Sequence, residues 1–588
     1  MSEDFLAIIE INPELHYHLI GQCQDLPGGV CKYCEEREVL WDERDRLAPF
    51  FTNLDREVFG LKLPQEVAGA LFSRYSRSAK DLRRVFLDEF LGEMEAFNTP
   101  MVSDDIEALK KARAFYDRVL VGYGDDSVAQ LGGAHIACEG ISNVAANLIE
   151  DARIGIAPLE KSTRYVRFDR KDPEGEYLFY KEPRIMSSKY ASKYLEVMNL
   201  LFQTYARQMD PMINFVTRRL PITEMPLKHP QTGEALTYAD VERDTELKKW
   251  AQTAYRATIR AHACDLLRGY LPASTKTNVG LFGVGQAFEY LLTKLYSHPL
   301  TEMRQLANQM HGELNVLIPS FVKRARSNSY LTDTYQNTRA FVQKETVGLN
   351  RAPSEAVALV DYDIDAEEKV LSTILYPHTR LPLRQLRDEV KSWDSERRTR
   401  LLREYLESRK HRRDKPGRAL EQVYYTFDLL GNLGMYRDLH RHRILSQERQ
   451  DFSTEHGYDT PNELAEIGFK KDFDQCMIQA ADLYEQIYAD LPHEAQYVVP
   501  FAYRVRWYMK MNLRELVHIA ELRTMPQGHP DYRVMVQEIC RKVETVHPML
   551  FQYAKFVDWK EYHLGRLQSE MRTEYKKSIL APNPESRP

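Results

Sequence analysis

Apolar residues recur at three- and four-residue spacing along most of the chain, which is the pattern of amphipathic helices. The clearest examples are residues 64–91, 190–209, 285–298, 470–491 and 533–556. Shorter alternating stretches predict strands at 176–180, 356–362 and 496–509. Helical patterns outnumber strand patterns, so the sequence predicts an α+β, helix-rich fold.

A polar stretch, NRAPSE at 350–355, separates a helical region from a new strand-like start. Both sides show the same order of elements: an apolar helix, a long helical stretch, and then a segment ending in proline, GYLP at 269–272 and YVVP at 497–500. This repeated order of elements indicates a duplicated domain rather than a solenoid. The predicted organisation is a cysteine-containing extension at 1–49 and two domains at 50–349 and 350–588.

Composition narrows the class of protein. A chain of 588 residues is too long for one hydrophobic core, and a net charge of -6 gives no support to nucleic-acid binding. The acidic start and the lack of a long apolar run favour a cytoplasmic protein without a membrane segment. Seven cysteines in a chain of this size agree with a reducing compartment.

Three cysteines are clustered near the N-terminus. Cys23, Cys31 and Cys34 lie within twelve residues, and Cys31 and Cys34 form a CxxC pair. Together with His16 or His18 they could complete a four-ligand zinc site. Unligated thiols in an N-terminal loop are the alternative.

Two stretches of the second half carry candidate chemistry. In HRHRILSQERQDFS, Arg441, His442 and Arg443 offer planar guanidinium forks for phosphate and an imidazole for a heteroaromatic ring. This suits a nucleotide or a flavin, although such a triplet alone is more often solvated surface charge. In MNLRELVHIAELR, helical spacing places Asn512 and Arg523 at the two ends of one side of a helix.

Together these stretches resemble the flavin-dependent thymidylate synthases. That family carries Arg-His-Arg followed after seven residues by Ser, and an Asn-x-Arg-x-Leu helix that closes with Leu-Arg. Asn512, Arg514, Leu516, Leu522 and Arg523 match the second pattern at the family's spacing. The resemblance covers most of residues 50 to 575 and implies two tandem domains of this family with divergent sequences.

The second half departs from the family where the nucleotide phosphate is held. Asp451 stands at the Ser position, Asp438 replaces a Gln, and Gln496 replaces an Arg. A carboxylate repels a phosphate, so this half is expected not to hold the phosphate with its own loop. The first half supplies the missing pattern: its STRY loop and its LRGYLP segment match the family's phosphate contacts.

The resemblance therefore implies a division of labour between the halves; random drift of both halves is the competing explanation. The implied nucleotide-binding residues are Ser162, Arg164 and Arg268. The implied flavin-binding residues are Arg441, His442, Arg443, Asn512, Arg514, His298, Glu421 and Ser127. Arg523 is the candidate catalytic residue, because a cation can stabilise the polarised uracil ring.

The implied reaction is the reductive methylation of dUMP to dTMP, with FAD as cofactor and methylenetetrahydrofolate and NADPH as co-substrates. The family is a homotetramer, so two duplicated chains are expected to mimic it as a homodimer. Asp438 and Asp451 leave a flavoenzyme acting on another pyrimidine nucleotide open as an alternative. A non-catalytic paralogue that binds flavin or nucleotide is a further alternative.

Overall fold

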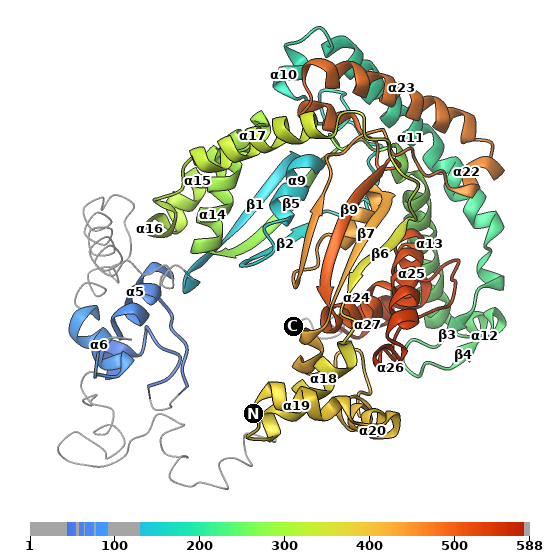
Figure 1. Cartoon of the computed structure of the whole chain (residues 1–588). Helices are drawn as coiled ribbons and strands as arrows, with labels where there is room; N and C mark the ends of the chain where they lie inside the picture. The colour runs from blue at the N-terminus through green and yellow to red at the C-terminus, as the bar shows by residue number, and fades with distance from the viewer. Residues whose placement is uncertain (1–43, 55–57, 64, 76–77, 92–129, 581–588) are drawn as a thin grey trace, which may run out of the picture.

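The structure is a computed structural model, and it describes residues 44–54, 58–63, 65–75, 78–91 and 130–580 (Figure 1). Ser127 and the predicted zinc ligands Cys23, Cys31 and Cys34 lie outside these residues. Within the described part of the chain, no helix combines the length and the apolar character needed to cross a bilayer.

The described residues between 44 and 91 pack around a small core of their own. This unit contains α4 (Arg44–Leu47), α5 (Gln65–Tyr75) and α6 (Leu82–Glu89). Its buried side chains, among them Phe51 and Phe86, form a cluster separate from the main core. The single helix predicted at 64–91 is two helices, because Asp81 caps the start of α6 by accepting a hydrogen bond from the Arg84 amide.

The first half of the chain is built on a three-stranded antiparallel sheet in the order β1-β5-β2. The strands are β1 (Gly133–Ser142), β2 (Ile156–Glu160) and β5 (Lys276–Val284). The principal helices are α9 (Asn143–Glu150), α11 (Ala191–Arg219), α13 (Thr245–Leu267), α14 (Gly285–Tyr296), α15 (Thr301–Leu317), α16 (Pro319–Val322) and α17 (Ser329–Glu345). Shorter elements are α10 (Pro183–Met186), α12 (Tyr238–Arg243) and the β3–β4 pair (Leu227–Lys228 and Ala235–Leu236).

The second half is built on a four-stranded sheet in the order β6-β7-β9-β8. The strands are β6 (Val357–Tyr362), β7 (Tyr424–Asn432), β8 (Leu445–Arg449) and β9 (Arg504–Asn512). The helices are α18 (Ala366–Leu375), α19 (Leu383–Lys391), α20 (Ser395–Leu406), α21 (Leu433–Leu439), α22 (Asn462–Glu466), α23 (Lys470–Asp490), α24 (Leu513–Arg523), α25 (Pro530–Val546), α26 (Pro548–Phe551) and α27 (Leu567–Leu580).

The two halves repeat one topology. The unit β1-α9-β2 corresponds to β7-α21-β8, and β5-α14-α15-α16 corresponds to β9-α24-α25-α26. The register agrees in detail: Ile156 of β2 pairs with Gly283, one residue before β5 ends, and Leu445 of β8 pairs with Met511, one residue before β9 ends. A shared register along equivalent strands is what duplication of one domain produces.

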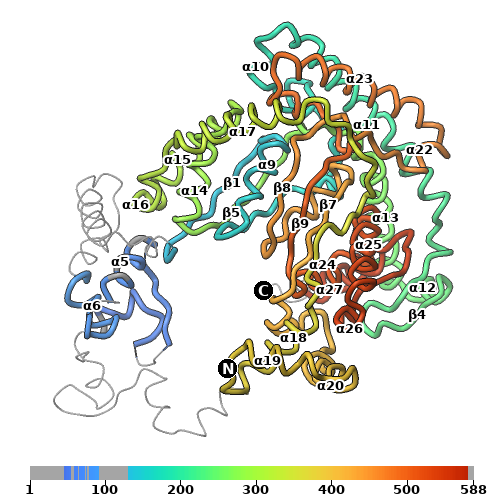
Figure 2. The backbone as a smooth tube through the Cα atoms, in the orientation of Figure 1, coloured from blue at the N-terminus to red at the C-terminus, as the bar shows by residue number. Residues whose placement is uncertain are grey.

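The two proline segments of the repeat pair with each other. The Ala273 amide donates to the Val499 carbonyl (2.8 Å), and the Phe501 amide donates to the Leu271 carbonyl (2.8 Å). Exchanging the halves exchanges these two bonds, so a local two-fold axis passes between Pro272 and Pro500, which form a bridge. Buried side chains of both halves join in one continuous core. The sheets lie side by side, and α11 packs against α23 (Figure 2).

Four of the eight predicted elements are confirmed as they stand, and prolines explain two of the differences. Helices α11, α14 and α23 and strand β6 lie where the patterns predicted them. The helix predicted at 533–556 ends before Pro548 and restarts as α26, because proline cannot continue the hydrogen bonding of a helix. The strand predicted at 496–509 begins only at Arg504, after a 3-10 turn and Pro500. The strand predicted at 176–180 is wrong; these residues form only isolated bridges.

Candidate functional site

The segment directly after α21 carries the Arg-His-Arg motif, which contacts the first half. Arg441 Nε donates to Glu150 Oε2 (3.2 Å), and the same guanidinium pairs with Glu160. One turn earlier, Arg437 pairs with Glu160 (2.5 Å) and donates to Thr163 Oγ1 (2.9 Å). Carboxylates from α9 and β2 therefore hold the motif of the second half beside the STRY loop of the first.

The predicted phosphate-binding arginines lie at the same junction. Arg164 Nε donates to Asp265 Oδ1 (3.0 Å), and its Nη1 donates to the hydroxyl of Tyr532 (3.2 Å). The Ser162 hydroxyl accepts from the Arg164 amide and shapes the loop. Arg268 is 4% exposed, and its Nη2 bonds to no atom of the described residues. A buried, unsatisfied guanidinium nitrogen is costly unless a ligand pairs with it.

Asp438 lies among four arginines, two from each half of the chain. These four, here called the arginine cluster, are Arg164, Arg268, Arg441 and Arg523. Burial alone would raise the pKa of Asp438, but the four positive charges outweigh burial and lower that pKa to about 2. Asp438 is therefore ionised and partly neutralises the cluster.

A glycine allows the Arg268 side chain to lie close to α21. Gly434 of α21 lies against the Arg268 guanidinium. A Cβ at this position would lie 3.0 Å from Arg268 Nε and 3.2 Å from its Cζ. The Gly434 amide also donates to the Phe501 carbonyl (3.1 Å), which ties α21 to the paired proline segments. The arginine of one half can lie over the helix of the other because this helix position has no side chain.

Arg523 is oriented through a chain of hydrogen bonds. Its Nε donates to His442 Nε2 (2.9 Å), and His442 Nδ1 lies 3.2 Å from Glu515 Oε1. Burial and the charge of Arg523 lower the pKa of His442 well below its usual value, so the ring is neutral. Since Nε2 accepts from Arg523, the ring proton is on Nδ1 and is donated to Glu515. Asn512 caps α24 by accepting from the Glu515 amide (2.9 Å), which holds the backbone of Glu515 in the first turn.

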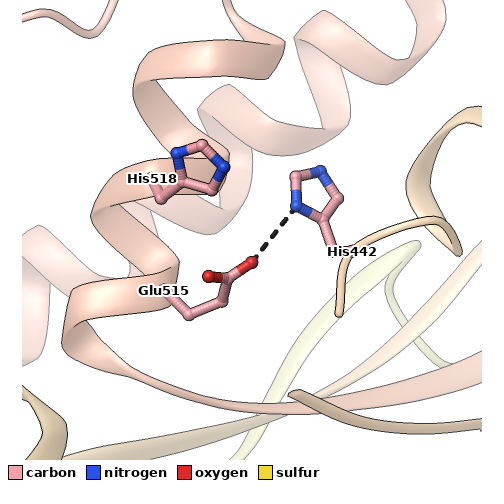
Figure 3. A group of neighbouring side chains, drawn as sticks. All are labelled: His442, Glu515 and His518. Atoms are coloured by element: carbon pink, nitrogen blue, oxygen red, sulfur yellow. Dashed lines mark hydrogen bonds and ion pairs between the residues drawn. The ribbon is translucent and has the colours of Figure 1, made fainter. Parts of the chain in front are cut away.

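Two of these side chains, His442 and Glu515, also form, with His518, the one group of potential metal ligands within the described residues. Ligand atoms of His442, Glu515 and His518 lie within 4.8 Å of one another (Figure 3). A metal-bound histidine normally donates its second ring nitrogen to an acceptor. Here the second nitrogens face cations: Arg523 Nε at His442 and Lys415 Nζ at His518 Nδ1 (2.9 Å). The group does not fit a metal ion.

The other residues implied by the resemblance lie in three different places. Arg514 pairs with Glu421 (2.8 Å) and donates to the Pro416 carbonyl, which joins two of the predicted flavin-binding residues directly. Arg443 is exposed and pairs with no described residue. His298 is not near the arginine cluster: its charged neighbours are His493, Arg449, Asp451 and Arg304.

Two cavities flank the junction of the halves. One, of about 350 Å³, is lined by Arg268, Asn432, Phe501, His529 and Asp531. The other, of about 320 Å³, contains His298 and is here called the second cavity.

Residue patterns did not identify the acidic partners of the cluster. Glu150, Glu160 and Asp265 pair with arginines of the site, and Arg566 reaches Asp265 from a distant segment (2.5 Å). Glu160 lies two residues before Ser162, and that proximity is the one local signal that marks it. The others are brought in by helix packing.

The fold and the site together define a duplicated α+β protein whose arginine cluster is shared between its halves. The model of the family described as thymidylate synthase complementing protein matches residues 82–320 and 358–549, and the chain belongs to this family. The two matches confirm the resemblance and the duplication inferred from sequence.

Several known proteins are similar to this chain. A UPF0159 protein of Chlamydia pneumoniae is 40% identical over 92% of this chain and 99% of its own length. One from Thermoplasma acidophilum is 34% identical over 86% and 98%. A flavin-dependent thymidylate synthase of Geobacter sulfurreducens is 31% identical over 23% of this chain and 63% of its length. The UMP/dUMP methylase PolB of Streptomyces cacaoi, solved with 5-Br dUMP, covers 34% of this chain and 93% of its own at 18% identity and a TM-score of 0.27.

Proposed function

We propose that the protein is a flavin-dependent thymidylate synthase that converts dUMP to dTMP, with methylenetetrahydrofolate and NADPH as co-substrates and FAD as cofactor. The observation that carries the proposal is the arginine cluster around Asp438. Two of its members come from the first half and two from the second. This is the division of labour expected if one half holds the nucleotide and the other holds the flavin.

The nucleotide phosphate is assigned to Arg268, Arg164 and Ser162. Arg268 offers a buried Nη2 with no described partner, and a phosphate oxygen would satisfy it. Arg164 is anchored by Asp265 and by Tyr532 of the second half, so its guanidinium is preorganised rather than mobile. A preorganised cation binds an anion without a further entropic cost of ordering the side chain.

Arg523 is assigned to the uracil ring as the catalytic residue. A cation beside the polarised carbonyl stabilises the negative charge that develops on the ring. His442 accepts from Arg523, and Glu515 accepts from His442, so the guanidinium is oriented before substrate binds. In this proposal His442 acts through Arg523 as well as contacting the flavin.

The hydrogen-bond donors of Arg441, Arg443, Asn512 and Arg514 suit an anionic flavin nucleotide. Arg443 is exposed without a described partner, and Arg441 is about one third exposed. Arg514 and Asn512 lie at the start of α24, where backbone amides and the helix dipole also favour an anion. These four side chains are assigned to hold FAD, which supplies the hydride-transfer chemistry when bound.

Asp438 favours a second candidate function. An ionised carboxylate can only accept hydrogen bonds, and it stands where the resembled family has an amide that also donates. A pyrimidine with an exocyclic amino group would pair with it, whereas the carbonyl oxygens of uracil would not. The alternative is therefore a flavoenzyme acting on an aminopyrimidine nucleotide.

The decisive experiment is tritium release from 5-tritiated dUMP with FAD, methylenetetrahydrofolate and NADPH. Release that is abolished by Arg523→Ala supports thymidylate synthesis. A protein that binds FAD but releases tritium only from a cytosine nucleotide supports the alternative. A colourless protein that takes up no FAD would overturn both enzymatic functions.

The composite site has its own test. Arg268→Ala is expected to weaken dUMP binding about tenfold or more without changing FAD binding, and Arg441→Ala is expected to do the reverse. Calorimetric titration of both ligands into both variants measures this. If both substitutions weaken the same ligand equally, the assignment of one ligand to each half is wrong.

The proposal includes a homodimer, in which two duplicated chains take the place of four single-domain subunits. Light scattering on the purified protein gives the assembly mass. A monomer that is fully active in the tritium assay would contradict this part of the proposal and leave the reaction unaffected.

A further inference from the structure

The second cavity is the counterpart of the arginine cluster under exchange of the halves. The strand registers of β2 and β8 make Asp451 equivalent to Ser162. The paired proline segments make Gln496 equivalent to Arg268. Asp451 and Gln496 both line the second cavity, together with Asp151 and Arg153 from the loop after α9. Duplication thus leaves two equivalent sites, of which only one has the phosphate-binding residues.

The phosphate-binding positions of the second cavity are occupied by contacts within the protein. Asp451 forms an ion pair with Arg339 of α17 (2.7 Å). Gln496 Oε1 accepts from the Phe452 amide (3.1 Å), and its Nε2 donates to the His493 carbonyl (3.3 Å). The Asp451 carboxylate would repel a phosphate, and position 496 provides no arginine to bind one. The positions equivalent to Ser162 and Arg268 therefore offer no ligand to a phosphate, while the cavity retains its volume.

Three buried polar atoms around the second cavity have no hydrogen-bond partner among the described residues: Gln447 Oε1, Arg153 Nε and Arg449 Nε. Arg153 is nevertheless held rigidly, since its Nη1 donates to the carbonyls of His442 (3.1 Å) and Leu445 (2.8 Å). One acceptor and two donors are complementary in kind to the N–H and the two carbonyl groups of a uracil or thymine ring, and a base in the cavity would contact them after a small rotation of these side chains.

Aromatic and imidazole rings also line the second cavity. Tyr436 and Tyr335 line the cavity, and so do His298 and His493, whose pKa values burial lowers, to about 4 for His298. Neutral rings of this kind favour an uncharged aromatic ligand. A volume of about 320 Å³ is within the range of small-molecule sites.

We propose that the second cavity binds an uncharged pyrimidine nucleoside, such as thymidine or deoxyuridine, at a site distinct from the arginine cluster. The proposed ligand has no phosphate because Asp451 and Gln496 stand at the positions that Ser162 and Arg268 occupy in the arginine cluster. The choice of a pyrimidine rests on the proposed function.

Calorimetric titration of the full chain with thymidine and with dTMP tests this site. Arg268→Ala is expected to leave thymidine binding unchanged while it weakens dTMP binding. Gln447→Leu is expected to weaken thymidine binding about tenfold, because one hydrogen bond to a buried acceptor is lost. Gln475→Leu, the same substitution on the exposed face of α23, is the matched control and should change neither. Thymidine binding that is absent, or that falls with Arg268→Ala and not with Gln447→Leu, overturns the proposal.

Asp451→Ser is a second test variant, at a residue that is not buried. The Asp451 side chain is 39% exposed, so Asp451→Ser should fold. In the Arg268→Ala background it should raise dTMP affinity about fivefold or more, because the repelling carboxylate is gone. No gain contradicts the proposed reason for excluding nucleotides. If the wild type releases no tritium from dUMP but thymidine follows this pattern, the proposed reaction fails and the second site stands.

Discussion

Arg268 Nη1 of the first half lies 3.7 Å from Asp438 Oδ2 of the second half. Arg268 occupies the position that Gln496 occupies in the second half, and Asp438 provides the negative charge at the centre of the arginine cluster. This contact couples the site to the association of the halves, so changes at the junction should alter ligand binding and stability together.

Asp438→Asn should destabilise the protein in the absence of ligand. It removes the charge that four arginines share and the ion-pair partner of the buried Arg268, and breaking a buried ion pair costs about 3 kcal/mol. Inorganic phosphate should then restore more of the melting temperature in the variant than in the wild type, since an added anion replaces the lost one. Thermal melts with and without phosphate measure this. Equal stabilisation of both proteins would show that Asp438 does not neutralise the cluster.

Gly434→Ala should weaken nucleotide binding without unfolding the protein. The new Cβ would lie 3.0 to 3.2 Å from the Arg268 guanidinium, which must move by a few tenths of an ångström. We expect dUMP affinity to fall about threefold to tenfold, as measured by calorimetry. Gly312→Ala is the matched control, because a Cβ on that helix position in α15 meets nothing within 4 Å. An effect of similar size in both variants would argue against a role for Arg268.

Glu515→Leu should lower kcat about tenfold or more and change the KM for dUMP much less. The substitution removes the acceptor that orients His442, so Arg523 loses its fixed position, whereas the phosphate contacts in the first half are untouched. Steady-state kinetics give the two parameters. Glu544→Leu on the exposed side of α25 is the control. A rise in KM at constant kcat would instead place Glu515 in substrate binding.

Stability should fall as the pH is lowered below neutrality, in part because of His298. Burial, with smaller effects from the charges of His493 and Arg449, lowers its pKa from 6.5 to about 4. Between these values the unfolded chain binds a proton that the folded chain does not, so the free energy of unfolding decreases as pH falls through this window. The contribution is at most about 3 kcal/mol. His298→Gln should flatten urea-denaturation stability across this range; an unchanged pH dependence would show that His298 titrates normally.

Much of the fold was readable in the sequence because helix periodicity is a local property. Three- and four-residue spacing marked α11, α14 and α23, and the repeated proline segments indicated the duplication. The motif residues Arg441, Asn512 and Arg523 were readable for the same reason: each lies in a short stretch with a fixed spacing. Errors arose where local signals competed, as in the proline-interrupted stretch before β9 and in the residues at 176–180.

The sequence by itself determined which residue types each half carries and which each half has lost: Ser162, Arg164 and Arg268 in one, and Arg441 and Arg523 in the other. Only the tertiary structure decided that the four arginines among them meet around Asp438, that Glu150, Glu160 and Asp265 pair with arginines of the site, and that His298 lines a separate cavity. The physical reason is that these contacts join residues about 100 to 370 positions apart. Such contacts depend on how the paired proline segments dock one half against the other, and no local spacing encodes that docking.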